Sequence, residues 1–457
     1  MESRVTDMTS GKPSKLILKF ALPLMLGGVF QHLYTVVDAA IVGQFCGVNA
    51  LAALGSTDWL VWFCLGFCVG LTQGFAILIA QHFGAKEYRL LRKSVAMSIV
   101  LAAAIAVLMS VLLQILAEPV LRLLNTDPAV LDEALLYLRI SYGGFAVVMA
   151  YNLLASVLRS LGDGTTPLVA MGVACAVNIG LDLLFVAAFH WGIGGAAGAT
   201  VTAQLVSCLY CAYRFRKLSL LKFSKEDWRL DRPLLKKLFS LGSPLAVQNM
   251  VIHIGGMVLQ SIINTYGVAF LAGFTATNKL YGALELAAIA FGYSIATYTG
   301  QNMGAEKIKR IKKGIRAATV LAIATSLAIT ALALIFSRPL TSLFINAGSE
   351  NAQEALQVAM SYLAVLAVFL PILYLLNIYR SALQGLGDTI TPFLSGMMEL
   401  AMRLACAFTL PMFLGGEGLF LAEPAAWFGA IILLVPVYFI RERKYLSLMV
   451  DRSAEAD

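Results

Sequence analysis

Charge is scarce in this sequence. Only 13% of its 457 residues are charged and 59% are hydrophobic, whereas an average soluble domain carries about 25% charged residues. A fold in water could not bury that much apolar surface, so lipid must be the solvent for most of the chain. The sequence also lacks a nucleophile–base set, a zinc motif and a phosphate-binding loop. These absences argue against a soluble globular protein and against an enzyme.

Long apolar runs take the place of charge. The chain has twelve such runs of about 20 residues or more, each long enough to span a bilayer as a helix. They are continuously apolar rather than alternating, which favours helices over a β-barrel. The first run is too long for the core of a cleavable signal, so we expect none. The sequence thus predicts an all-α polytopic membrane protein whose twelve transmembrane helices cover residues 15–41, 51–81, 94–117, 133–158, 166–189, 194–213, 239–265, 271–300, 314–336, 354–384, 391–413 and 419–440.

The net charge of +8 is distributed asymmetrically. Lysine and arginine gather in alternate loops, which is the positive-inside pattern of membrane proteins and argues against nucleic acid as a partner. The pattern places both termini and the linker 214–238 in the cytoplasm. We therefore expect a multi-pass protein of a bacterial-type cytoplasmic membrane. The basic loops contain Lys12, Lys15 and Lys19; Lys86, Arg89, Arg92 and Lys93; nine residues from Arg214 to Lys237; six residues from Lys307 to Arg316; and Arg441, Arg443 and Lys444.

The chain repeats itself. Residues 152–167 match residues 377–392 at eight of sixteen positions, and shorter matches have similar offsets. We predict two pseudo-symmetric six-helix lobes, 1–213 and 239–457, joined by the cytoplasmic linker 214–238; the second lobe ends in a short cytoplasmic tail. Both copies start on the same side, so they are parallel repeats, an architecture that suits alternating access. The shorter matches pair Gln81–Ala85 with Gln301–Ala305 and Pro23 with Pro244.

Three acidic side chains interrupt the apolar runs: Asp38, Asp58 and Asp182. A carboxyl group in a bilayer is costly unless it has a partner or a task, so each is a candidate functional residue. The alternating direction of the helices places all three at similar depth, in the outer part of the first lobe. A structural role is the alternative, above all for Asp58, which could hydrogen-bond a local kink.

Polar neighbours accompany these acids. Asn178 lies four residues before Asp182 on one helix, and Thr200 lies at matching depth on the next helix. Carboxylates, an amide and a hydroxyl form an all-oxygen set, which suits a hard monovalent cation or a proton shared by acids that cannot both ionise. In the second lobe Arg403 and Ala407 occupy the positions of Asn178 and Asp182. We therefore expect ion coupling in the first lobe only.

Several motifs together resemble one transporter family. The stretch Pro23–Gly43 resembles the first helix of MATE (multidrug and toxic compound extrusion) transporters, and the resemblance covers nearly the whole chain. It implies an antiporter that expels cationic, often aromatic, compounds in exchange for inward H⁺ or Na⁺. The other matching motifs are the Gly-Asp-x-x-Thr-Pro turns at 162–167 and 387–392, the Gln-x-x-Gly-Ala ends at Gln81 and Gln301, and Asn178–Asp182.

The same resemblance implies which residues bind the coupling ion. In the branch of the family with an ion site in the first lobe, the matching positions here are Asp38, Asn178, Asp182 and Thr200. The Gly-Ala-Thr context favours Thr200 over Thr202. If the coupling ion is Na⁺, Asp38, Asn178 and Asp182 would be its metal ligands. We expect no cofactor besides the coupling ion, H⁺ or Na⁺.

A substrate cavity for organic cations needs apolar and aromatic walls. Gln31 and Tyr34 share one stripe of the first helix with Asp38, and aromatic rings can contact a cation through their faces. The expected partners are thus the lipid bilayer and small organic cations, and we expect a monomer. The candidate cavity residues are Gln31, Tyr34, Asp58, Trp59, Trp62, Tyr142, His253 and Arg403.

Other ionisable residues leave alternatives open. The i, i+4 spacing of Glu399 and Arg403 predicts an internal ion pair, while no role is assigned to Lys279, Glu285 or Arg380. Arg380 and Arg403 keep a lipid-linked oligosaccharide flippase of related fold as an alternative, because such a protein needs a cationic cavity. A pseudo-symmetric channel is the alternative from a different class.

Overall fold

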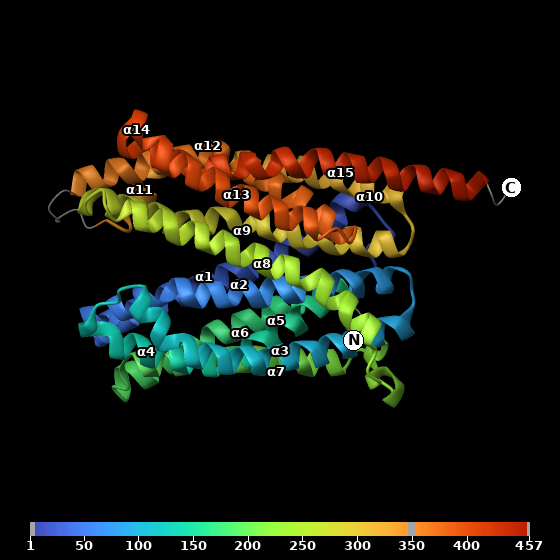
Figure 1. Ribbon diagram of the computed structural model, residues 1–457, viewed down its shortest axis with the longest axis horizontal. Helices are drawn as coiled ribbons and strands as arrows, with labels where there is room; N and C mark the ends of the chain where they lie inside the picture. The colour runs from blue at the N-terminus through green and yellow to red at the C-terminus, as the bar shows by residue number, and fades with distance from the viewer. Residues whose placement is uncertain (1–4, 346–351, 455–457) are drawn as a thin grey trace. The chain divides into compact units, whose positions relative to one another are not determined.

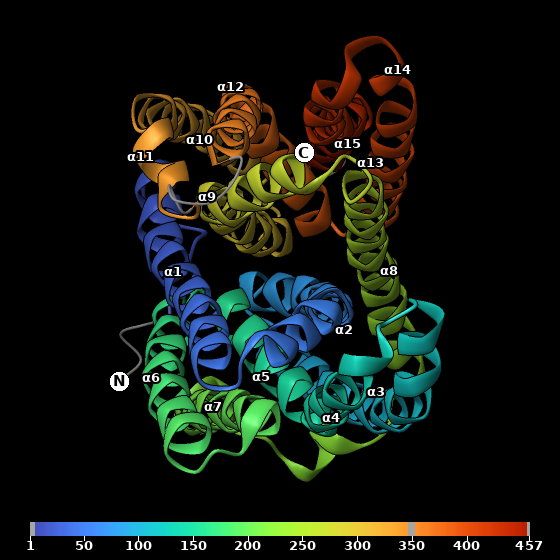
Figure 2. The same ribbon diagram turned by 90° about the vertical axis from the view of Figure 1, so that its left-hand side faces the viewer.

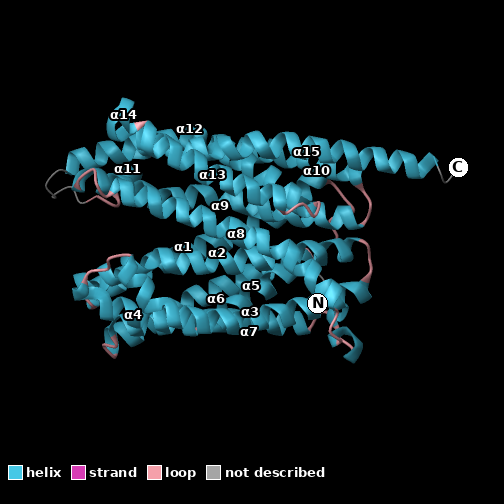
Figure 3. Cartoon of the chain, viewed as in Figure 1, coloured by secondary structure: helices cyan, strands magenta, loops and turns pink. Residues whose placement is uncertain are grey.

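The computed structural model describes residues 5–345 and 352–454, and within these ranges the chain is helical with no β-strand (Figure 3). This confirms the prediction of an all-α fold. The α-helices are α1 (Pro13–Phe45), α2 (Val48–Gly84), α3 (Tyr88–Leu123), α4 (Pro128–Gly143), α5 (Phe145–Ser160), α6 (Thr165–Asp182), α7 (Gly192–Arg216), α8 (Arg232–Ile263), α9 (Val268–Gly304), α10 (Ile308–Ile335), α11 (Ser337–Ser342), α12 (Ala352–Gly385), α13 (Ile390–Thr409), α14 (Pro411–Leu414) and α15 (Ala422–Ala454). A π-helical segment, η2 (Leu183–Ala188), follows α6, and short 3-10 helices are η3 (Ser219–Leu221), η4 (Lys225–Trp228) and η5 (Gly415–Leu421).

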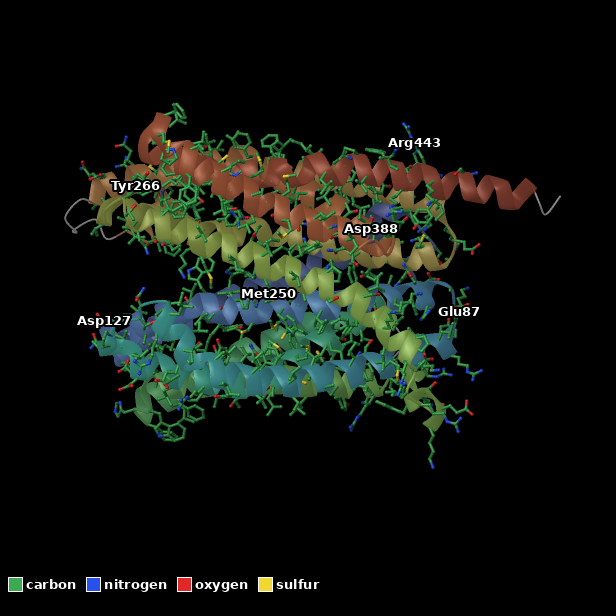
Figure 4. The ribbon with its side chains drawn as sticks, viewed as in Figure 1. Glu87, Asp127, Met250, Tyr266, Asp388 and Arg443 are labelled. Atoms are coloured by element: carbon green, nitrogen blue, oxygen red, sulfur yellow. The ribbon has the colours of Figure 1, made fainter. Side chains whose placement is uncertain are left out.

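The helices are long and apolar enough for the twelve predicted spans. Ten segments of the described chain are long and apolar enough to cross a membrane, and the bent pair α4 and α5 adds an eleventh if it forms one span. One of the ten, Ile390–Tyr445, contains both α13 and α15, which gives twelve when the two are counted separately. Their side chains are mostly carbon along the helices (Figure 4). The chain is therefore a polytopic membrane protein.

One predicted span is broken in the middle. The run 133–158 forms α4 and α5, which meet at Gly144 with a bend of 46°. A Cβ atom at position 144 would lie 2.6 Å from Cγ2 of Val201 in α7. Only glycine allows this close approach, so tertiary packing against α7 sets the bend.

The chain divides into two compact units. The first unit comprises Leu26–Ala246 with the N-terminal residues up to Asp7, and the second comprises Met8–Met25 and Val247–Asp457. The first half of α1 thus belongs to the second unit, and the first half of α8 belongs to the first. Each division lies two residues beyond an internal proline, Pro23 or Pro244, where a missing backbone hydrogen bond makes a helix easy to bend. The repeat predicts lobes made of whole helices and does not indicate this exchange.

In the first unit, α2 packs against α4 and α5, while α7 packs against α4, α5 and α6. Figure 1 shows these helices running side by side, and Figure 2 looks along them. Glu87, before α3, and Asp127, after it, mark opposite ends of the unit (Figure 4). The second half of α1 and the end of α6, which carry the predicted acids, belong to this unit.

In the second unit, α9 and α12 form the centre, and α13 packs against α15. Aromatic side chains fill the core: the rings of Phe274 and Tyr362 stack at 4.3 Å, and Trp427 and Tyr298 are buried. Such rings stabilise the core because they bury large areas and stack in a defined geometry.

Candidate functional site

The predicted acids meet in the first unit. Asp38 lies on α1 and Asp182 is the last residue of α6, and they are 6% and 0% exposed. Their carboxyl groups are close enough to hydrogen-bond to each other when one of them carries a proton. The helix changes from α to π geometry directly after Asp182, and π segments inside helices are frequent at functional sites.

The oxygen atoms of this group are poorly satisfied. Among the residues that the structure describes, both carboxylate oxygens of Asp182, Oδ1 of Asp38 and Oδ1 of Asn178 are buried without a hydrogen-bond donor. Two negative charges about 4 Å apart repel by about 4 kcal/mol at an effective dielectric constant near 20. The two carboxylates therefore need a shared proton or a cation between them. Buried unsatisfied acceptors in a native fold indicate such a missing partner.

An amide and a hydroxyl complete the oxygen set. Asn178 is 1% exposed, and its Nδ2 donates to Oγ1 of Thr200 at 3.3 Å. That bond orients the amide, because Nδ2 is taken up by α7 and Oδ1 is left for another ligand. Thr202, in contrast, is exposed and donates to the carbonyl of Gly198 in its own helix at 2.7 Å. The structure thus brings Thr200, and not Thr202, to Asn178.

Four more residues surround the acid pair. Asp58 on α2 and Tyr34 on α1 both interact electrostatically with Asp38, and Tyr34 also hydrogen-bonds Gln204 on α7. Tyr137 on α4 is 7% exposed and interacts with Asp38, Asp58 and Asp182.

Sequence reasoning missed Tyr137 and Gln204. Tyr137 lies near the outer start of the predicted span 133–158, at the depth of the acids, so the topology that grouped the acids could have found it. Gln204 follows Thr200 by one turn on α7, and helical spacing could have indicated it in the same way.

The other predicted cavity residues are spread over both units. Gln31 and Trp59 are half-buried, Trp62 is 36% exposed, and Tyr142 is buried beside Cys64, with which it hydrogen-bonds. His253 and Arg403 belong to the second unit, where they interact electrostatically. Among the aromatic candidates, Tyr34 interacts with Asp38 of the acid pair.

Two buried guanidinium groups of the second unit, those of Arg403 and Arg380, are each paired with a glutamate. Arg403 Nη2 donates to Oε2 of Glu423 at 2.8 Å, and Nη1 donates to the carbonyl of Ile252 at 3.1 Å. A Cβ atom at Gly255 would lie 2.5 Å from Arg403 Nη1, so a larger residue at this position would displace the guanidinium group.

Arg380 pairs with Glu399 and contacts Oγ of Ser395 at 3.3 Å. The predicted pair of Glu399 with Arg403 is therefore wrong. Each of these two residues instead binds a partner on a neighbouring helix.

The donor set of the first unit fits a hard cation better than a transition metal. Within residues 5–345 and 352–454 no three His, Cys, Asp or Glu side chains come together as a metal site. Asp38, Asn178, Asp182 and Thr200 offer carboxylate, amide and hydroxyl oxygens only, which suit hard ions. The group can hold one proton or one small monovalent cation.

Comparison with known proteins agrees with the fold. The MatE family model matches residues 23–184 and 244–409. The probable multidrug resistance protein YpnP of Bacillus subtilis is 32% identical over 308 residues, with 67% of this chain and 68% of that protein covered. YoeA of the same organism, also named as a probable multidrug resistance protein, is 26% identical, with 98% and 99% covered. A solved structure of MATE in complex with MaL6 has a TM-score of 0.90 at 22% identity and covers 96% of this chain and 99% of that one. The resemblance predicted from the helix motifs is confirmed, and the chain belongs to the MatE family of multi-pass membrane transporters, which are not enzymes.

Proposed function

We propose that the protein is a secondary active antiporter that exports organic cations in exchange for inward H⁺ or Na⁺ by alternating access. The observation that carries this proposal is the buried pair Asp38–Asp182, in which Oδ1 of Asp38 and both carboxylate oxygens of Asp182 lack donors. A static structural role would favour satisfying these atoms or replacing them, since unpaired buried carboxylates are costly. A site that fills and empties during a cycle requires them to be free in one state.

Charge compensation couples the two fluxes. With the pair empty, Asp38, Asp58 and Asp182 attract a cationic substrate into the first unit. Binding of a proton or Na⁺ removes one negative charge and weakens that attraction, so substrate is released outside. The same event changes the contacts of Asp38 on α1, a helix that Pro23 makes easy to bend. The ion then leaves on the cytoplasmic side, where we place both termini.

An aromatic wall supports a cationic substrate. Tyr34 lies beside Asp38, and Trp59 and Trp62 follow Asp58 on α2, with Trp62 36% exposed. Ring faces bind cations by about 0.5–2 kcal/mol each. Affinity for varied organic cations therefore comes from rings, and the response to the coupling ion comes from the acids. We propose that one monomer in the bilayer suffices, with no cofactor.

The alternative flippase needs free cationic groups for a phosphate-bearing lipid. Arg380 and Arg403 are each paired with a glutamate, Glu399 and Glu423. Neutralised guanidinium groups bind an anion weakly, so these pairs favour the antiporter. A channel would give single-channel currents without saturable exchange.

Efflux from inverted membrane vesicles tests the proposal. Asp38→Asn and Asp182→Asn each remove one charge with little change of shape, and both should abolish exchange driven by an imposed pH or Na⁺ gradient. The control Asp132→Asn changes an exposed aspartate in α4 and should leave exchange unchanged. Imposing the two gradients separately identifies the coupling ion. Coupled efflux at the wild-type rate in both asparagine variants would exclude the scheme.

A further inference from the structure

The linker between α7 and α8 carries an excess of positive charge. Residues 214–237 contain nine basic and three acidic residues, a net charge of +6. All three acids are engaged by basic residues of α3, so they do not neutralise the linker's own cations. Within the described parts of the chain, none of the nine linker cations forms an ion pair. The pairs with α3 are Arg89–Glu226 at 3.7 Å, Arg92–Asp227 at 3.5 Å and Lys93–Asp231 at 2.6 Å.

Packing holds this segment in one conformation. Leu218 and Leu221 are buried, and the ring of Phe223 lies 6.0 Å from Phe215 and 5.4 Å from Trp228. The carboxylate of Asp227 accepts hydrogen bonds from the backbone N–H and the hydroxyl of Ser224 and closes a capping box. A folded segment presents its charges in a fixed pattern, which lowers the entropy lost when a ligand binds.

The uncompensated cations lie on the surface beside apolar side chains. Trp228 is 44% exposed and Leu230 is 64% exposed, and they flank Arg229. Tryptophan prefers the interface between membrane and water, and this segment joins the ends of two helices long enough to span a bilayer. The exposed cations are Arg216, Lys217, Lys222, Lys225, Arg229, Arg232, Lys236 and Lys237.

We propose that residues 214–237 form a binding platform for the phosphodiester headgroups of anionic phospholipids. The leaflet concerned is the one that the positive-inside pattern makes cytoplasmic. Clustered lysine and arginine next to a span attract anionic lipid, while the Trp228 and Leu230 side chains insert at the level of the glycerol backbone. A soluble nucleic acid would use the cations but leave these apolar side chains in water. The proposal is independent of the transport cycle.

Competition between lipids tests the platform on the full-length protein. The detergent-solubilised chain is mixed with equal amounts of phosphatidylglycerol and phosphatidylcholine, and native mass spectrometry measures which lipid stays bound. We expect phosphatidylglycerol to be retained preferentially. The variant Lys222→Gln/Lys225→Gln/Arg229→Gln should lower that preference by about tenfold or more, since each cation contributes separately to lipid attraction.

A matched variant separates a site from general surface charge. Lys309→Gln/Lys313→Gln/Arg316→Gln removes the same number of exposed cations from α10 in the second unit and should keep the preference. An equal loss in both triple variants would overturn the proposal. Displacement of phosphatidylglycerol by inorganic phosphate, or by a short oligonucleotide, would overturn it too. If the linker variant does not fold, the single change Lys225→Gln is measured in the same way and should give a smaller loss.

Discussion

The two units differ in how their buried polar side chains are partnered. In the first, Asp38 and Asp182 lie together, and Oδ1 of Asp38 and both carboxylate oxygens of Asp182 meet no donor. In the second, Arg403 stands at the repeat position of Asn178, and its guanidinium is bound by Glu423 and by a backbone carbonyl. The same helical plan thus carries two neighbouring carboxyl groups without a counter-charge in the first unit, and in the second unit a guanidinium group paired with a carboxylate.

Because of this difference, substitutions of buried polar residues should have different effects on stability in the two units. Removing one partner of a buried ion pair destabilises a fold by about 3–5 kcal/mol, because the other charge is left uncompensated. An unpaired carboxylate is itself an uncompensated charge, so replacing it by an amide costs little stability or adds some. Comparable substitutions should therefore act on folding in the second unit and on ion coupling in the first.

The largest effect is expected at the acid pair. Asp182→Asn should reduce gradient-driven exchange to the level of vesicles without the transporter, while the midpoint of thermal unfolding in detergent stays equal or rises. The reason is that the amide removes the charge that binds the coupling ion and also removes its desolvation cost. Vesicle efflux and thermal unfolding measured on one preparation check both parts. A variant that loses exchange only because it unfolds would contradict the comparison.

The second largest effect is expected at the ion pair Arg403–Glu423 of the second unit. Glu423→Gln should lower the free energy of unfolding by about 3–5 kcal/mol, because Arg403 keeps its charge and loses its partner. The double variant Arg403→Met/Glu423→Leu removes both charges and should recover most of that loss. Denaturant unfolding in micelles measures it, with ion coupling followed in parallel. If the double variant still binds the coupling ion with wild-type affinity, the pair has no part in coupling; lost ion binding would place a coupling group in the second unit.

A smaller effect should distinguish two threonines on α7. Thr200→Val removes the acceptor that orients Asn178, and it should weaken binding of the coupling ion by about 1–2 kcal/mol, close to the value of one buried hydrogen bond. Thr202→Val removes only a bond within its own helix and should leave ion affinity unchanged. Isothermal titration or the half-saturating ion concentration for exchange measures the difference. Equal effects of the two changes would argue against the orienting role of Thr200.

The sequence predicts the depth of a residue far better than its partner. Alternating helix direction predicts that Asp38, Asp58 and Asp182 lie at similar depth, and the structure brings Asp38 to both other acids. The i, i+4 rule failed for Glu399 and Arg403: spacing shows that two residues share a face, but neighbouring helices decide which group each one meets. The bend at Gly144 escaped prediction for the same reason, since it depends on Val201 in another helix.

The smallest effect is expected outside the membrane-spanning segments, where each unit has an ion pair between a lysine and an acidic side chain. The Lys93 ammonium and the Leu234 N–H hold the pKa of Asp231 below its usual range. Because the pKa of Asp231 is lower in the folded than in the unfolded state, the pair stabilises the fold fully at pH values above the unfolded-state pKa of about 3.9. This stabilisation is lost as the pH falls through the folded-state pKa. Since both side chains are partly exposed, we expect about 0.5 kcal/mol. Asp231→Asn should show this loss at pH 7 and a smaller loss at pH 3 in denaturant unfolding. In the second unit, Glu442 is 6% exposed and is bound to Lys312 at 2.8 Å. Glu442→Gln should lower the free energy of unfolding more than Asp231→Asn does, because burial reduces screening by solvent. A larger loss for Asp231→Asn than for Glu442→Gln would show that exposure does not set the strength of these pairs.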